Sequence, residues 1–173
     1  MTSTETSTGE RADLLEALGK ARYFLRYTVR DLTDEQAAAR PTASELGLGG
    51  LIKHVAGTEQ EWARFILDGP DPNLSAYDEA TYTAWAAQFV MTPEDSLEAI
   101  LARYQEVADR TDQLVRDLPD LDLSHPLPAA PWFEPGARWS ARRVLMHIVA
   151  ETAQHAGHAD IIRETIDGSK SMG

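Results

Sequence analysis

The chain has 173 residues and no cysteine, and its 28 acidic residues outnumber its 16 basic ones, which gives a net charge of −12. This length suffices for one domain that buries a core without disulfides or a structural metal ion. The charge disfavours nucleic acid and anionic membranes as partners, and the lack of cysteine excludes thiolate ligands and a cysteine nucleophile. Any thiol chemistry therefore needs a thiol from outside the chain.

The two ends of the chain are predicted to lie outside a single domain over residues 9–168. Residues 1–8 are rich in Ser and Thr without apolar anchors, so we expect a disordered leader, and we expect a flexible tail over 169–173. The N-terminal stretch lacks the basic and apolar segments of a secretory signal, and no apolar run is long enough to span a membrane. A cytoplasmic location is expected.

Two helices are predicted in the first 70 residues, over about 9–31 and 49–67. Between them, Thr33 with Gln36 is typical of a capped short helix or turn. The motif DGPDPN ends the second helix. The apolar positions at helical spacing are Leu14, Leu18, Ala21 and Leu25 in the first helix, and Leu51, Val55, Thr58, Trp62 and Phe65 in the second.

Two further long helices are predicted after a short helix around 78–87. The third helix is expected to begin with Thr92 as its N-cap and Pro93 in its first turn, and the fourth to run from a Ser140 cap to about residue 166. Residues 119–139 contain five prolines and no helical period, so they predict a long loop. No stretch alternates as a strand does, and the pattern predicts an all-α four-helix bundle with a long loop before the last helix.

The motif HIVAETAQHAGH in the fourth helix places four ionisable side chains on one face. His147, Glu151, His155 and His158 follow one another at steps of four, four and three residues, which a helix brings to one stripe. Helical angles of about 100° per residue place Val144 among them, so we expect the stripe to point into the bundle. Such groups are costly to bury unless they are paired or bind a metal ion.

The second predicted helix supplies a matching group, His54, on its inward face. His54 with Glu151 and His155 would give two imidazoles and a carboxylate, a set that suits Zn²⁺ first, with Ni²⁺, Fe²⁺ or Mn²⁺ as alternatives. His147 with Glu151 is an equally good chelate on spacing alone. Buried histidines in a hydrogen-bonded network, without a metal ion, are the competing interpretation.

These residues resemble the DinB/YfiT-like superfamily of metalloenzymes, whose last helix carries His, three residues, His, three residues, His. Here Glu151 stands in place of the middle His. A His, Glu, His set is similar to that of the mycothiol-dependent maleylpyruvate isomerase branch. The resemblance implies a four-helix bundle, His54, Glu151 and His155 as ligands, and a metal ion that helps to activate a thiol cofactor.

The function we expect is a divalent-metal-dependent S-transferase or isomerase that uses an external thiol such as mycothiol and an electrophilic substrate. His158 is the candidate for proton transfer, or else a group that orients a ligand. In the loop APWFEPGARW, Trp139 and Arg138 are the candidates for cofactor binding, with Trp132 and Phe133 as lid residues or as a plug for the end of the bundle. We count a second copy of the chain as a candidate partner.

Two other functions fit the same residues. A metal-dependent hydrolase would use bound water and need no thiol, and a DinB-like bundle without activity would serve as a binding or dimerisation module. His125, in the motif SHPLP, lies outside the stripe and has no predicted role.

Overall fold

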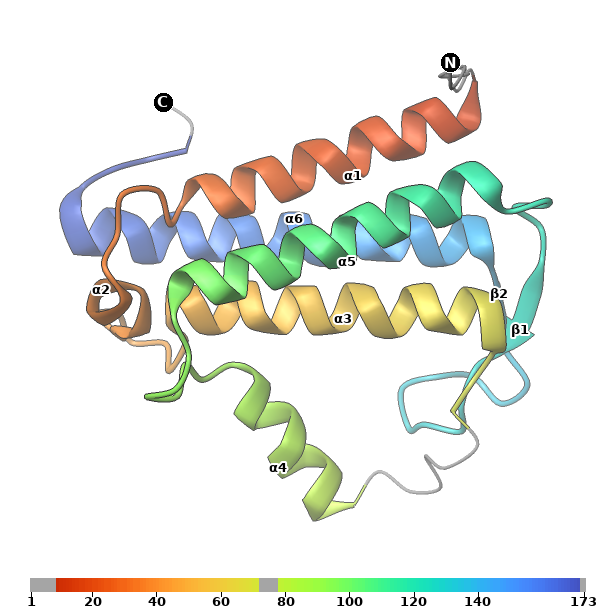
Figure 1. The fold of residues 1–173 in the computed structure, drawn as a ribbon. Helices are drawn as coiled ribbons and strands as arrows, with labels where there is room; N and C mark the ends of the chain where they lie inside the picture. Colours follow the sequence, from red (N-terminus) through yellow and green to blue (C-terminus); the bar gives the residue numbers. More distant parts are fainter. Residues whose placement is uncertain (1–8, 72–77, 172–173) are drawn as a thin grey trace.

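Four long helices form a bundle in the computed structural model, which describes residues 9–71 and 78–171. These helices are α1 (Glu10–Tyr27), α3 (Leu48–Asp68), α5 (Leu97–Asp117) and α6 (Ala141–Asp167) (Figure 1). Two short helices and two short strands complete the fold, namely α2 (Asp34–Ala38), α4 (Glu79–Gln88), β1 (Ser124–Pro126) and β2 (Arg138–Ser140). The predicted four-helix bundle is confirmed. None of the described helices combines the length and apolar character needed to cross a membrane.

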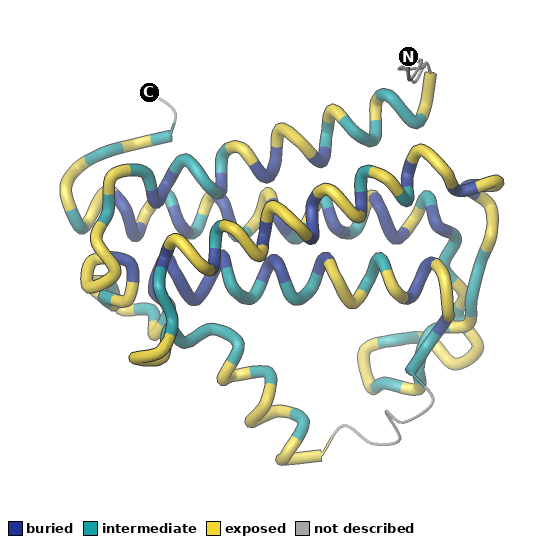
Figure 2. Tube along the Cα trace, viewed as in Figure 1, coloured by how far each residue is buried: buried dark blue, intermediate teal, exposed yellow. Residues whose placement is uncertain are grey.

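Each of the four long helices packs against two others, and one of these pairs is α1 with α5. α6 packs against both α1 and α3, and α3 also packs against α5. Buried residues line the inner faces of the four long helices (Figure 2). The short helix α4 has no buried residue and lies outside the bundle, beside α3 (Figure 1). One side of α3 therefore belongs to the core, and another side faces α4.

The first helix ends earlier than the sequence predicts. α1 stops at Tyr27, and the chain then turns as far as Asp31, which has a positive φ of 58°. The Thr28 hydroxyl donates to the Leu25 carbonyl oxygen, so this turn satisfies part of the helix end. The predicted cap at Thr33 is confirmed, since its hydroxyl accepts from the Gln36 amide in a complete capping box.

The predicted start of the third long helix at Thr92 is wrong, because Ser96 is the N-cap of α5. The Ser96 hydroxyl accepts from the Ala99 amide. Asp95 is used elsewhere, as it pairs with Lys53 at 2.7 Å and accepts from the Thr92 amide in a separate turn. Thr92 therefore belongs to a turn that Asp95 closes and that Lys53 of α3 contacts, and the helix starts four residues later than predicted.

The proline-rich loop contains a short antiparallel hairpin that the sequence does not predict. β1 and β2 pair His125 with Trp139. Each strand has three residues, too few to show an alternating pattern. The His125 ring lies 3.2 Å from the Ile66 carbonyl oxygen and packs on the ring of Phe65, so it fixes the hairpin to the end of α3. The rest of the predicted loop is irregular.

The structure describes most of the predicted C-terminal tail but not the predicted N-terminal leader. The leader over residues 1–8 lies outside the described residues. Of the tail, Ser169 and Ser171 donate backbone N–H groups to Asp167 and Asp160, and the Lys170 side chain lies 3.6 Å from Glu164. These residues fold back along the end of α6.

A buried polar layer separates two hydrophobic clusters along the bundle. One cluster includes Leu51 and Ile162, and the other includes Ile66 and Leu145. Between them, the Arg22 guanidinium donates to both oxygens of Glu59, at 2.5 and 3.1 Å, and to Asp112 at 2.7 Å. Glu151 and His155 of α6 lie beside this polar layer.

The buried ion pair between Arg22 and Glu59 should be sensitive to the loss of either partner. Replacing only one partner, as in Arg22→Met or Glu59→Leu, leaves the other charge buried and unpaired, so each single change should lower the free energy of unfolding by about 3–5 kcal/mol. The double variant should recover most of this loss, because apolar side chains can replace a buried ion pair at little cost. Urea unfolding measures all three variants.

The control is Glu106→Ala on the exposed face of α5, which should change the free energy of unfolding by less than about 0.5 kcal/mol. A double variant whose loss equals the sum of the two single losses would contradict this account of the layer.

Candidate metal centre

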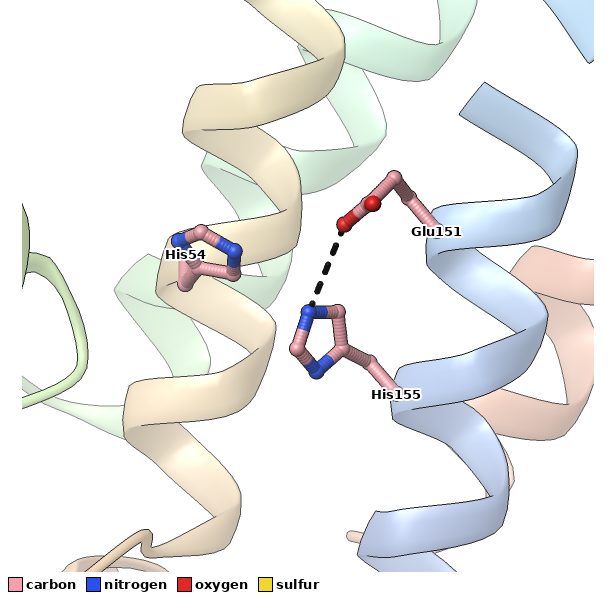
Figure 3. A group of neighbouring side chains, drawn as sticks. All are labelled: His54, Glu151 and His155. Atoms are coloured by element: carbon pink, nitrogen blue, oxygen red, sulfur yellow. Dashed lines mark ion pairs between the residues drawn. The ribbon is translucent and has the colours of Figure 1, made fainter. Parts of the chain in front are cut away.

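Three side chains from two helices converge beside the polar layer. His54 comes from α3, and Glu151 and His155 come from α6 (Figure 3). Each offers one potential ligand atom, and these atoms lie within 4.8 Å of one another. The His155 Nε2 atom lies 3.6 Å from a Glu151 oxygen, and the rings of His54 and His155 are 5.0 Å apart between centroids. Over residues 9–71 and 78–171, this is the only group of three such side chains.

His147 lies next to this cluster but does not join it. His147 precedes Glu151 by one helical turn, and its Nε2 atom is 4.0 Å from the Glu151 oxygen that His155 does not approach. Glu151 therefore lies between two imidazoles, and only His155 shares a ligand cluster with His54. Of the two chelates that spacing left open, the structure brings Glu151 and His155 together with His54.

The stripe on α6 lies at the edge of the buried face, not within it as the sequence predicts. The side chains of His147, Glu151 and His155 are 23%, 31% and 16% exposed. Thr152 and Ala156, which follow Glu151 and His155 by one residue each, are buried and point to the middle of the core. Helical angles identify residues that share a face, but neighbouring helices determine where the buried face has its centre. The stripe therefore keeps part of each side chain in contact with solvent.

The protonation states suit a divalent cation. Burial, followed by the neighbouring His155, lowers the pKa of His54 to about 4, so its imidazole is neutral at pH 7. The neighbouring His155 imidazole, 3.6 Å away, lowers the pKa of Glu151 despite its partial burial, so the carboxylate is ionised. Metal ligands need these two forms. The Nδ1 atoms of His54 and His155 are buried without a hydrogen-bond partner among the described residues. Imidazole nitrogens that lack a hydrogen-bond partner beside a carboxylate fit a metal centre.

An aromatic ring covers one side of the cluster. Phe89 follows α4 and stacks on His54, with 3.9 Å between ring centroids and 23° between planes. Two glycines at the start of α3 permit this contact, because a Cβ atom on Gly50 would lie 1.8 Å from the Phe89 carbonyl oxygen and one on Gly49 would lie 2.0 Å from the Met91 sulfur. Phe89 is a site residue that the sequence patterns did not predict. The pair Gly49-Gly50 inside a helix was the available signal.

Two tryptophans pack around His147, next to the cluster. Trp62 of α3 and Trp139 of β2 stack 5.0 Å apart, and each ring lies 5.0 Å from the His147 ring. The Arg143 guanidinium lies 4.1 Å from the centre of the Trp139 ring. The predicted site residue Trp139 is therefore connected to Glu151 through His147.

The other residues predicted for cofactor binding lie farther out. Arg138 is exposed and donates to the carbonyl oxygen of Ser124 on the other strand of the hairpin, at 2.6 Å. Trp132 is half exposed and meets Trp85 of α4, while Phe133 packs against Trp139. The loop thus reaches both the bundle and α4.

His158, predicted to transfer protons, lies on the next turn of α6 after His155 and is half-buried. Within the described part of the chain it makes no hydrogen bond, ion pair or ring contact, so the structure does not bring it into the cluster of His54, Glu151 and His155.

Comparisons with known proteins identify the family of the chain. The sequence model of the Mycothiol-S-transferase family matches residues 13–168, which include the whole cluster. No curated protein matches the chain.

Two solved structures share the fold. YfiT from Bacillus subtilis, described as a probable metal-dependent hydrolase with an unusual four-helix bundle topology, aligns with a TM-score of 0.67 at 17% identity, over 98% of this chain and 95% of YfiT. A conserved protein from Enterococcus faecalis aligns with a TM-score of 0.64 at 16% identity, over 94% of this chain and 100% of that protein. The predicted resemblance to DinB/YfiT-like bundles is confirmed at the level of fold.

The contact between Phe89 and α3 generates a prediction with an internal control. Gly50→Ala should lower the free energy of unfolding by about 1–3 kcal/mol, because its Cβ atom would displace the backbone at Phe89. Gly57→Ala in the same helix would meet only the Gln88 side chain, at 3.8 Å, and should raise the free energy of unfolding by about 0.5–1 kcal/mol. Urea unfolding measures both. Equal effects would show that Phe89 does not pack as described.

Lowering the pH should destabilise the metal-free chain through His54. Its pKa is about 4 in the folded chain against an ordinary value of 6.5, so between these values the unfolded chain binds a proton that the folded chain does not. The free energy of unfolding therefore falls as the pH drops through this window. In His54→Asn, urea unfolding with a chelator present should show a shallower fall. Parallel pH curves for the variant and the natural chain would contradict the burial of a neutral His54.

Proposed function

The chain belongs to the mycothiol-S-transferase family, and from this membership we propose that it is a metal-dependent enzyme that activates an external thiol, as an S-transferase or a thiol-dependent isomerase. The observation that carries the proposal is the convergence of His54, Glu151 and His155 within 4.8 Å, with protonation states that suit a cation. The half-buried position of the three side chains supports the access of small molecules.

The three residues would hold a divalent cation, with Zn²⁺ as our first candidate and Ni²⁺, Fe²⁺ or Mn²⁺ as alternatives. Two imidazoles and one carboxylate leave at least one coordination position for a further ligand, as in catalytic sites. A bound cation would lower the pKa of a thiol and so favour the nucleophilic thiolate at neutral pH. Because the chain has no cysteine, this thiol comes from outside, and we propose mycothiol. The acceptor is a small electrophile.

Residues around the cluster would position these molecules. We propose that Trp139 contacts an apolar part of the thiol or the electrophile, since its ring lies beside His147 at the edge of the site. Arg138 would hold an anionic group at the rim, in exchange for its contact with Ser124. His158 stays our candidate for proton transfer. His147 would orient Glu151, which its Nε2 atom approaches to 4.0 Å.

The proposal has a corresponding setting in the cell. The net charge of −12 opposes binding to nucleic acid, so the proposed partners are small molecules. We propose a cytoplasmic location, where a low-molecular-weight thiol is kept reduced.

Glu151→Gln provides the most direct test, because it keeps the size of the side chain and removes the charge that a cation needs. Protein purified without added metal should carry about one divalent ion per chain, and Glu151→Gln should lower metal affinity at least about tenfold. Conjugation of monobromobimane or a chloroaromatic compound should depend on mycothiol in the natural chain and fall in parallel with metal content in the variant.

The matched control is Glu106→Gln on α5, which changes the same chemical group on an exposed face and should leave metal content and conjugation unchanged. Equal conjugation with and without mycothiol would overturn thiol transfer, and turnover of an ester or amide without thiol would favour the hydrolase. A chain without stoichiometric metal would favour a binding module.

A further inference from the structure

The outer face of α6 is exposed and carries no charge over four helical turns. Between Met146 and Ile161, the exposed residues of α6 are Met146, Ala150, Ala153, Gln154, Gly157 and Ile161, which we call the outer α6 face. Met146 and Ile161 are 56% and 63% exposed. The exposed face of α5, by contrast, carries Arg103, Glu106, Asp109 and Arg110. An uncharged face is therefore a particular feature of α6 in a chain of high net charge.

The spacing on this face is that of a helix-packing seam. Its apolar positions follow one another at steps of four, three, four and four residues, with the two large side chains at the ends and small ones between them. Small residues in the middle allow another helix backbone to approach closely.

The fold of a single chain does not account for Gly157. A Cβ atom added there would meet nothing within 4 Å, so no neighbour in the chain requires a glycine. Glycine inside a helix lowers its stability by roughly 1 kcal/mol relative to alanine. The lack of a side chain at Gly157 therefore suits a close contact with another molecule.

We propose that this face binds the same face of a second copy of the chain, with the two α6 helices antiparallel around a two-fold axis between Ala153 and Gln154. Met146 then packs against the partner's Ile161, and Ala150 packs against the partner's Gly157. The same symmetry places Arg143 beside the partner's Glu164, so opposite charges meet at both ends of the seam. Both residues are exposed, and within the chain Arg143 lies over the Trp139 ring and Glu164 lies 3.6 Å from Lys170. A surface that is complementary to itself in apolar and charged groups fits an identical partner.

The charge of the chain favours this face over others. Two copies that each carry a net charge of −12 repel one another, so they associate best where a charge-free surface is rimmed by opposite charges. One helix face buries less than the roughly 800 Å² per partner of a standard interface. The dimer is therefore expected to be weak and to depend on protein concentration and salt.

The interface lies on a different side of α6 from the metal centre. Glu151 and His155 are half-buried toward α3, whereas Ala150 and Gly157 are exposed. Variants of Ala150, Ala153 and Gly157 therefore leave the ligand cluster in place, and the dimer can fail without affecting the proposed function.

Sedimentation velocity on the full chain over a range of concentrations tests the proposal. The natural chain should shift from the mass of one chain, 19.1 kDa, toward twice that value as concentration rises. Ala153→Glu should weaken the self-association more than about tenfold, because it buries two like charges at the axis. The control is Leu67→Glu, which places the same charge on an exposed apolar position of α3 and should leave the association unchanged.

A charge exchange tests the antiparallel arrangement itself. Arg143→Glu or Glu164→Arg alone should weaken the dimer, and the two together should restore it. Because the chain has no cysteine, Ala153→Cys should also form a disulfide-linked dimer under mild oxidation, which Leu67→Cys should not do.

Three results would overturn the proposal. The first is a chain that stays monomeric at every concentration. The second is a dimer that Ala153→Glu leaves intact, which would locate the interface elsewhere. The third is a double charge variant that does not recover, which would exclude the antiparallel pairing. Circular dichroism and urea unfolding of each variant show whether it has kept its fold.

Discussion

The packing of α3 against α6 is the contact on which both the core and the metal centre depend. His54 comes from one of these helices and Glu151 and His155 from the other, so the ligand cluster exists only in the register that this packing imposes. The same contact brings Trp62 of α3 beside His147 of α6, next to the ligand cluster. The buried side chains of α3 and α6 fix the register between these two helices.

The cluster combines partial burial with unsatisfied polar groups, which is costly for a fold. A neutral His54, whose pKa burial lowers to about 4, and buried Nδ1 atoms without partners are explained more simply by a ligand that the site is built to hold than by stability. Nearby, Glu59 is fully buried but paired with Arg22, so the chain does satisfy polar groups elsewhere in the same layer. The contrast within a single bundle points to function at the cluster.

The sequence was sufficient for the helices and for the residues of the cluster, because both depend on spacing along a helix. His54, Glu151 and His155 could be selected from helical spacing, and the family resemblance chose among the alternatives. Contacts between distant segments were beyond its reach. The start of α5 depends on the ion pair between Lys53 and Asp95, and the hairpin on the fit of His125 against the end of α3. Phe89 reaches His54 only because Gly50 lets a distant backbone approach.

The central claim is that one divalent ion binds between α3 and α6, held by side chains from both helices. Anomalous diffraction from crystals of protein purified with its own metal, recorded on both sides of the absorption edge, would identify the ion and its ligands directly. The account predicts a single site contacted by nitrogen atoms of His54 and His155 and by an oxygen atom of Glu151. An ion bound by His147 and Glu151 without His54, or no anomalous peak between these helices, would contradict it.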